Sequence, residues 1–405
     1  MSGDGHRPDI ACQHVVMTEI RPRAWLEIDA GILRHNARTL RRAIPATTAL
    51  GLLVKANGYG HGLVVAARAG VAGGADRLIV VSIEEALELR AAGIDVPILV
   101  VYALPDAALE TAALAGIEVS VSGPDVVDRA VEAWTRVAAR LPDARLAVHL
   151  EVDTGMGRGG LAPADVLAAI EAMETAPRID LVGIWTHLAD GSDPERSARQ
   201  VERFEHACAA IVASGRSLPV RHIAATEGLV CETSPTLDMV RIGLGYYGEL
   251  GVDVVPSPAM SPIAADLRPA LAVKARPIRV EDLAAGSSVG YGSEWTATRP
   301  SRIATLPIGY ADGWTRAYWP GSDVLVRGRR VPLVGRVSMD SVCADVTDLP
   351  GVTPEDEFVL LGAQGDERIG AVELARRRGS IPNEVLCDFG PRLARFVMDD
   401  DAAQE

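Results

Sequence analysis

The feature that most constrains the fold is a series of eight short apolar runs separated by stretches of helical periodicity. The runs are typical of buried strands, whereas stretches such as 83–92 and 126–141 repeat their apolar residues at helical spacing. Alternating strands and helices predict a parallel sheet, and eight strands can close a (β/α)8, TIM-like barrel. The alternative is an open, doubly wound sheet, but no G-x-G-x-x-G turn follows the first run. The runs lie at 50–56, 78–82, 98–102, 117–121, 146–152, 181–186, 220–224 and 239–244.

The pattern changes after Gly251, where the proline- and serine-containing segment 255–262 is interpreted as a linker. Beyond it turn-bounded strands dominate, and 326–332 is typical of a β-hairpin. A second, mostly antiparallel β domain follows from this change. We predict a disordered extension at 1–19, a barrel at 20–254 that includes a strand at 25–29 followed by a helix capped by Asp29, and a C-terminal β domain at 255–405.

Composition excludes several classes of function. A net charge of -14 argues against nucleic acid as a partner, because phosphate binding needs a basic face. No apolar run reaches membrane-spanning length, and residues 1–16 lack the apolar core of a signal peptide. The five cysteines are scattered without metal-ligand spacing, which favours reduced thiols and no metal site. We therefore expect a cytoplasmic protein that acts on small molecules and does not bind membranes.

In a β/α barrel, functional side chains lie at the carboxyl ends of the strands. The first run ends in Lys55, where desolvation favours the neutral amine that reacts with carbonyls. A lone lysine at a strand end more often simply extends to solvent, so a functional role for Lys55 has to be supported by neighbouring residues. Four later runs also carry functional candidates at or just after their ends: Glu151 and Arg158, Thr186 and His187, His222 and Thr226, and Arg241 with Gly243.

Together these side chains match the needs of one cofactor. Lys55 offers an amine to an aldehyde, an imidazole can lie against a ring, and Arg241 can approach a third ring position. Tyr59, Thr226 and backbone amides near Gly243 can hold a phosphate. This set predicts a pyridoxal 5'-phosphate site.

The segment Val54–Gly62 resembles the cofactor-lysine motif of the alanine racemase family. Segments 153–158, 309–313 and 335–340 resemble three further motifs, in the family's order, and the resemblance runs from about Trp25 to Arg395. It implies a barrel with a C-terminal β domain, pyridoxal phosphate, a homodimer with shared active sites, and interconversion of L- and D-alanine. The expected activity is that of an isomerase, an amino-acid racemase that serves D-alanine biosynthesis.

Three alternatives remain at this point. A racemase for serine or another larger amino acid is the nearest one. A decarboxylase on the same two-domain plan does not need the two opposed bases that the resemblance implies. A non-catalytic pyridoxal phosphate-binding protein belongs to a different class, and the β domain argues against it.

The resemblance implies a role for each matched residue. Lys55 and Tyr291 are the two catalytic bases, with Tyr291 delivered from the partner subunit and supported by His222 with Arg241 behind it. Arg241 faces the pyridine nitrogen as a donor, which suits a racemase better than an aminotransferase. Arg158 and the backbone amide of Met339 hold the substrate carboxylate, and Glu151 and Tyr310 are supporting residues. The implied cofactor-binding set is Lys55, Tyr59, His187, His222, Thr226, Arg241, Gly243 and Leu244.

The chain departs from the family pattern in four places, one of which covers two residues. Glu151 replaces a lysine that is carbamylated in many members, and as an anion it can orient Arg158 without carbon dioxide. Ser338 replaces a cysteine, and Ala225 with Thr226 replaces an asparagine and a serine. Pro391 aligns with a tyrosine that contacts phosphate and limits substrate size, so its presence predicts a wider pocket.

Overall fold

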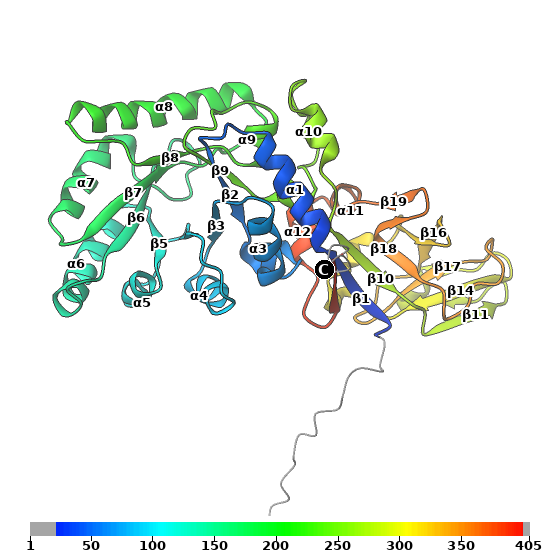
Figure 1. Cartoon of the computed structure of the whole chain (residues 1–405). Coiled ribbons are helices and arrows are strands. Elements are labelled where there is room, and N and C mark those ends of the chain that lie inside the picture. Colours follow the sequence, from blue (N-terminus) through cyan, green and yellow to red (C-terminus); the bar gives the residue numbers. More distant parts are fainter. Residues whose placement is uncertain (1–21, 400–405) are drawn as a thin grey trace, which may run out of the picture.

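The structure, a computed structural model, describes residues 22–399. The extension predicted at 1–19 therefore lies outside the described residues. Within 22–399, a barrel occupies one end of the molecule and a large sheet the other (Figure 1). No helix among these residues is both long enough and apolar enough to cross a bilayer.

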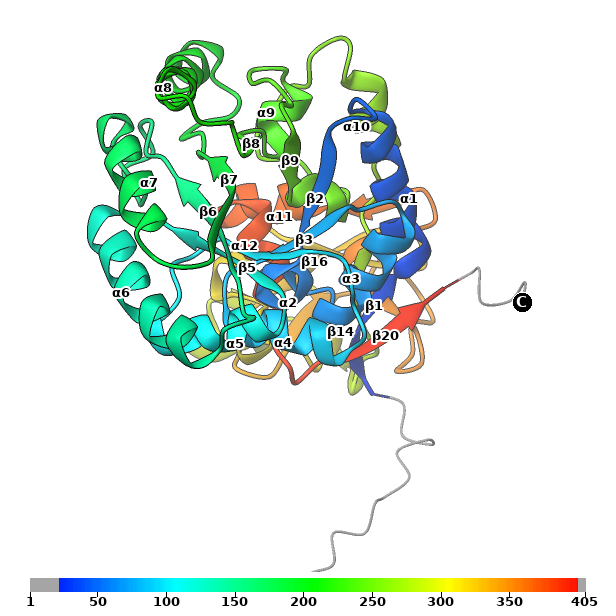
Figure 2. The same cartoon turned by 60° about the vertical axis from the view of Figure 1, so that its left-hand side comes forward.

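Eight parallel strands close into a barrel, which confirms the predicted fold. Their central residues are buried on both faces, which explains why the sequence shows continuous apolar runs instead of alternation. Helices cover the outside of the strands (Figure 2). The strands are β2 (Ala49–Leu53), β3 (Arg77–Val80), β4 (Ile98–Val100), β5 (Ile117–Val121), β6 (Leu146–Glu151), β7 (Ile179–Trp185), β8 (Val220–His222) and β9 (Met239–Ile242). The helices of this part are α1 (Ala30–Arg42), α2 (Lys55–Tyr59), α3 (Leu63–Ala72), α4 (Ile83–Ala91), α5 (Leu109–Leu114), α6 (Pro124–Arg140), α7 (Val166–Glu174), α8 (Pro194–Ala213), α9 (Thr226–Val230) and α10 (Ser261–Asp266).

The second sheet is mostly antiparallel, as predicted for the C-terminal part of the chain. Its strand order is β11-β14-β17-β16-β15-β18-β10-β1-β20, with β19 beside β18. The predicted hairpin is confirmed as the antiparallel pair β15–β16. The strands are β10 (Leu271–Ala275), β11 (Arg279–Leu283), β14 (Ser301–Leu306), β15 (Asp323–Val326), β16 (Arg329–Val334), β17 (Val342–Asp345), β18 (Phe358–Gln364), β19 (Glu367–Ile369) and β20 (Ala394–Met398), with the small pair β12 (Ser288–Val289) and β13 (Trp295–Thr296) apart. Helices α11 (Ala371–Arg378) and α12 (Pro382–Cys387) precede β20.

One predicted range needs correction at its start. Strand β1 (Ala24–Asp29) belongs to the second sheet, where it pairs antiparallel with β10 and parallel with β20, and not to the barrel predicted at 20–254. The sequence identified the strand but not its partners, because pairing depends on segments far along the chain. Asp29 then caps α1 as predicted, since its Oδ1 accepts the backbone N–H of Ile32 at 2.8 Å.

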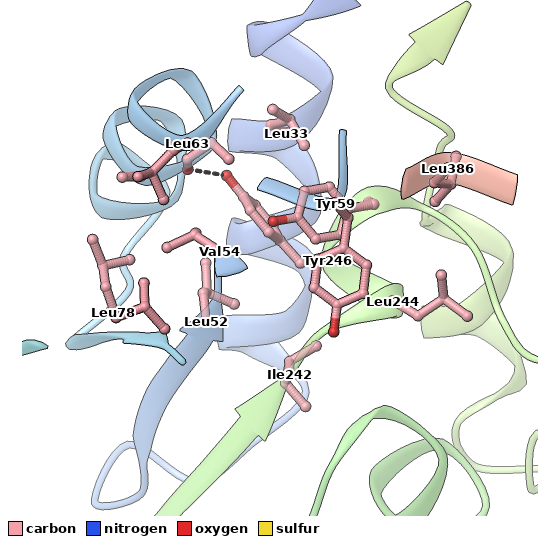
Figure 3. Close-up of a cluster of buried hydrophobic side chains, with 14 of the residues drawn as sticks. Leu33, Leu52, Val54, Tyr59, Leu63, Leu78, Ile242, Leu244, Tyr246 and Leu386 are labelled. Atoms are coloured by element: carbon pink, nitrogen blue, oxygen red, sulfur yellow. Dashed lines mark hydrogen bonds between the residues drawn. The ribbon is translucent and has the colours of Figure 1, made fainter. Parts of the chain in front are cut away.

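A buried apolar cluster fixes the strand that leads to Lys55 (Figure 3). Leu52 and Val54 are fully buried in it, and the Tyr246 hydroxyl donates to the backbone oxygen of Ala66 at 2.6 Å. Leu386 of α12 reaches the same cluster beside Tyr59. The C-terminal segment therefore packs directly on the part of the barrel that carries Lys55.

Candidate active site

A cavity of about 400 Å³ opens at the carboxyl ends of the barrel strands. Its walls come from the ends of β2, β3, β7 and β9, from the start of α9 and from α12, so residues distant in sequence meet there. Eight of the predicted site residues line it: Lys55, Tyr59, Arg158, His187, Thr226, Arg241, Gly243 and Leu244. Because parallel strands all end at one rim, a strand-end pattern in the sequence becomes a single site in space.

Lys55 stands where β2 gives way to an unusual turn. Strand β2 ends at Leu53, and the half-buried Lys55 then opens α2, whose next four residues all have positive φ. The helix is therefore one left-handed turn and not an α-helix. It directs the chain away from the strand axis, with the Lys55 side chain on the cavity wall.

Arg241 lies at the cavity base with almost all of its donors committed. Nη1 donates to Nδ1 of His222 at 3.0 Å and to the His222 backbone oxygen at 2.9 Å. Nη2 donates to the backbone oxygen of Thr186 at 2.8 Å and lies 3.3 Å from Nδ1 of His187. Burial lowers the pKa of Arg241 to about 9, and no carboxylate of the described residues forms an ion pair with it. Its Nε–H makes no hydrogen bond with the described residues, and Arg241 lines the cavity.

Behind Arg241 a chain of hydrogen bonds crosses the barrel interior. Nε2 of His222 lies 2.9 Å from Nδ1 of His149, and Nε2 of His149 lies 2.9 Å from Oε2 of Glu118. Arg77 completes the chain by donating to Oε1 of Glu118 at 2.9 Å. An added Cβ at Gly183 would lie 1.9 Å from the His149 ring, so only glycine leaves room for that imidazole. The sequence interpretation missed Glu118 and His149, although a charged residue and a histidine inside apolar strands signal buried partners.

The electrostatics of this chain follow from burial and from its neighbours. Burial lowers the pKa of His222 and of His149, so both imidazoles are neutral. Burial also opposes ionisation of Glu118, but the hydrogen bonds from His149 and Arg77 and the charge of Arg77 outweigh it and hold the pKa of Glu118 below its usual value. The chain thus carries a cation at each end and one internal anion.

The structure corrects the role expected for His222. This histidine is fully buried, does not line the cavity, and has both ring nitrogens engaged by Arg241 and His149. It can affect a bound ring only through Arg241. The imidazole that reaches the cavity is His187, whose pKa burial and the charge of Arg241 lower to about 3.

Tyr59, Thr226, Gly243 and Gly245 lie together and form a cradle whose hydroxyl groups are suited to an anion. An added Cβ at Gly243 would lie 2.7 Å from the Tyr59 hydroxyl, and one at Gly245 would lie 2.9 Å from Cγ2 of Thr226. The absence of side chains at both glycines keeps this space open. Burial raises the pKa of Tyr59, which keeps its hydroxyl protonated as a donor. Thr226 Oγ1 accepts the Gly245 N–H at 3.2 Å, so its own hydrogen remains available.

Arg158 extends over the cavity from a loop that Asp153 holds together. Oδ1 of Asp153 accepts the backbone N–H groups of Gly155 and Met156, each at 2.9 Å. The Arg158 guanidinium is exposed and lies 6.0 Å from the ring centroid of Tyr102. This leaves its donors free to bind a carboxylate that enters the cavity.

Glu151 does not contact Arg158 as the sequence interpretation expected. No hydrogen bond or ion pair joins the two side chains among residues 22–399, although Arg158 and Arg241 both act on Glu151 through their charge. Glu151 is only 7% exposed, and burial raises its pKa to about 7. Glu151 therefore acts on Arg158 through its charge, without direct contact, and only when the Glu151 carboxyl group is ionised.

Pro391 does not itself contribute to the cavity wall. It is exposed and outside the cavity, whereas Ile381 and Asn383 of the α12 region line the wall. On this side the wall is therefore formed by α12 and the residue before it, and not by the turn that follows. The lining residues that sequence reasoning missed include Tyr102, Trp185, Glu227, Ile381 and Asn383.

The three predicted residues of the C-terminal part lie together but away from this cavity. Tyr291, Tyr310 and Met339 are 72%, 44% and 51% exposed, and none of them lines it. Their loops adjoin, since the Tyr310 N–H donates to the Ser338 oxygen at 3.0 Å and an added Cβ at Gly290 would lie 3.1 Å from the Arg336 nitrogen. They form one exposed loop cluster on the β domain.

Comparisons with known proteins agree with this architecture. The sequence models of the alanine racemase N-terminal domain and C-terminal domain match residues 28–250 and 270–397. An alanine racemase from Symbiobacterium thermophilum is 40% identical over 93% of this chain and 97% of its own. The crystal structure of an alanine racemase from Bacillus anthracis with bound L-Ala-P superposes with a TM-score of 0.85 at 30% identity, covering 94% of this chain and 96% of that one. A histidine racemase from Leuconostoc mesenteroides shares the fold, with a TM-score of 0.81 at 29% identity over 93% of this chain and 98% of its own. The chain belongs to the alanine racemase family.

Proposed function

We propose that the protein is a pyridoxal phosphate-dependent racemase that interconverts L- and D-alanine as a homodimer. The observation that carries the proposal is that Lys55 and Arg241 line one cavity, and that the Arg241 Nε–H has no hydrogen-bond partner among residues 22–399. An amine and a donor without a carboxylate partner suit a cofactor that has an aldehyde and a pyridine nitrogen.

The residues present fit this cofactor. The cradle formed by Tyr59, Thr226, Gly243 and Gly245 matches a phosphate group in its open space and its hydroxyl donors. Leu244 adds its backbone to the same wall, and His187 offers a neutral imidazole to the face of a ring. When bound, the cofactor supplies an aldehyde that links covalently to an amine and a conjugated ring that withdraws electrons from the α-carbon.

Each residue then has a physical task. Lys55 would hold the cofactor and, once the substrate amine has displaced it, its free amine would move a proton at one face of the substrate α-carbon. Arg241 would donate a hydrogen bond to the ring nitrogen without protonating it, which would limit electron withdrawal and suit racemisation. Arg158 binds the substrate carboxylate.

Inversion of a stereocentre requires a second proton-transfer group on the opposite face. The exposed loop cluster supports a shared site, because Tyr291 lies 72% exposed and outside the cavity of its own chain. In a homodimer, Tyr291 of the partner subunit supplies that group. The neutral His187, which carries its hydrogen on Nε2, is the imidazole positioned to support the phenol. The backbone amide of the partner's Met339 binds the substrate carboxylate. The partner's Tyr310 lies in the loop beside the partner's Met339.

Two alternatives have less support. The similarity to alanine racemases favours alanine over serine or a larger substrate. A non-catalytic cofactor-binding barrel does not need the C-terminal domain that residues 270–397 match.

The test measures the optical activity of alanine and the exchange of its α-proton in D2O. With pyridoxal phosphate added, L-alanine and D-alanine should each yield a racemic mixture, and deuterium should appear at the α-carbon. Serine, histidine and a leucine control are assayed in parallel. A cofactor-loaded protein that exchanges no α-proton on alanine would overturn the proposal.

A further inference from the structure

The turn after Lys55 is conformationally strained. Ala56, Asn57, Gly58 and Tyr59 have φ of 52°, 54°, 60° and 49°. Three of these four residues carry a Cβ, which crowds the backbone in the left-handed region. Such a turn persists only where surrounding contacts hold it.

Glu85 supplies the contact next to Lys55. Its Oε1 accepts the backbone N–H of Ala56 at 2.7 Å, and its Oε2 accepts the N–H of Val81 at 3.1 Å. Ala56 follows strand β2 and Val81 follows β3, so one carboxylate joins the ends of two adjacent barrel strands. Charge-assisted bonds to backbone amides are among the stronger hydrogen bonds in proteins.

The far end of the turn has its own anchor. Oδ1 of Asn57 accepts the N–H of Leu63, the first residue of α3, at 2.9 Å. Asn57 belongs to the turn itself, whereas Glu85 reaches it from α4. Of these two hydrogen bonds that hold the turn, the one from Glu85 is therefore external and lies next to Lys55 in the chain. The adjacent Glu84 is exposed and forms no side-chain hydrogen bond with the described residues, which makes it a matched control.

We propose that Glu85 is a positioning residue for Lys55. Its carboxylate holds the left-handed turn so that the lysine amine stays directed into the cavity. Glu85 does not line the cavity, and it acts through the backbone of Ala56. The inference rests on the proposed function, because it concerns the lysine that links to the cofactor.

The experiment compares Glu85→Gln with Glu84→Gln in the full-length protein. Glutamine keeps one acceptor oxygen and turns an N–H group toward the other amide. In the cofactor-free protein, hydrogen exchange of peptides covering 55–60 should accelerate at least about tenfold in Glu85→Gln. Borohydride trapping of added pyridoxal phosphate at Lys55, followed by mass spectrometry, should slow by a similar factor. Glu84→Gln should match the parent in both measurements.

A second variant separates this role from simple capping of α4. Glycine adopts positive φ without strain, so Ala56→Gly added to Glu85→Gln should restore much of the trapping rate. If Glu85 only capped α4, a change at residue 56 would restore nothing. If Glu85→Gln does not fold, Glu85→Asp, which keeps the charge but has a shorter reach, replaces it with the same expected losses.

The inference is overturned if the Glu85 variant traps the cofactor and exchanges at parental rates, or if Ala56→Gly gives no recovery. Failure of the proposed function is a separate result. In that case the parent itself would not trap the cofactor at Lys55 or racemise alanine. The hydrogen-exchange rates of peptides covering 55–60 would still show whether Glu85 stabilises the turn.

Discussion

Nη1 of Arg241 lies 3.0 Å from Nδ1 of His222, and this contact sets the direction of every hydrogen bond behind it. Arginine can only donate, so Nδ1 of His222 accepts and Nε2 carries the hydrogen. His222 then donates to His149, and His149 donates to Glu118. The chain has no vacant acceptor next to Arg241, so it orients the guanidinium and does not move protons.

Replacing Glu118 tests this chain. Glu118→Gln removes the anion that faces both His149 and Arg77, and we expect a loss of about 1–3 kcal/mol in the free energy of unfolding. The pKa of Glu118 is lowered in the folded state, so its contribution is present above its unfolded pKa and is lost as pH falls through the folded one. Denaturant titrations at several pH values should show a smaller acid-dependent loss in the variant than in the parent. Glu110→Gln, at an exposed pair with Arg140, is the control and should change little.

Replacing Lys55 should remove covalent attachment of the cofactor. Lys55→Ala keeps the strand and the turn but removes the cavity amine. We expect racemisation to vanish together with the yellow absorbance that shifts on borohydride reduction. Peptide mapping of a Lys55→Ala protein that still carried a reduced adduct at another lysine would contradict the assignment.

Glu151 should make substrate binding depend on pH near neutrality. Burial raises its pKa to about 7, so the anion that acts on Arg158 develops as pH rises through that value. We expect KM for alanine to fall across this range in the parent, and Glu151→Gln to lack the inflection. Bicarbonate should not change the activity, since no carbamate forms.

The same pKa shift has a consequence for stability. The folded state holds the Glu151 proton more tightly than the unfolded state does. The free energy of unfolding therefore decreases as pH rises from the unfolded pKa of Glu151 to its folded pKa of about 7. Glu151→Gln should therefore melt at a higher temperature than the parent at pH 8. Equal melting temperatures at pH 8 would show that Glu151 is ionised at no cost.

Position 383, and not 391, should control substrate range. Asn383 lines the cavity and Pro391 is exposed outside it. Asn383→Tyr should narrow the cavity and shift the ranking of a substrate panel toward alanine. Pro391→Tyr should leave that ranking unchanged, and a shift there would contradict the assignment of this wall.

The two-base proposal predicts complementation between inactive variants. Tyr291→Phe removes only the phenolic oxygen of an exposed side chain, so folding should be retained, and racemisation should fall at least ~10²-fold. Solvent deuterium exchange should survive on the enantiomer whose α-proton faces Lys55. Mixing Lys55→Ala with Tyr291→Phe protein should restore partial activity, because a mixed dimer has one intact site. No recovery despite proven subunit exchange would place both bases in one chain.

The sequence determined the barrel and much of its rim. Buried strands and amphipathic helices are local patterns, and parallel strands bring their ends to one rim whatever their order. For this reason Lys55, His187 and Arg241 could be assigned to one site before any contact was known. The family resemblance added Tyr291 and Met339, which no local pattern distinguishes from ordinary surface residues.

Tertiary structure alone decided which distant segments pack together. It placed β1 in the second sheet, Asn383 in the wall of the cavity, and His222 behind Arg241 instead of in that wall. It also joined Glu118 to Arg241 through two histidines and Glu85 to the turn after Lys55. These relationships depend on side chains from separate strands and helices meeting at hydrogen-bond distance, which local periodicity does not encode.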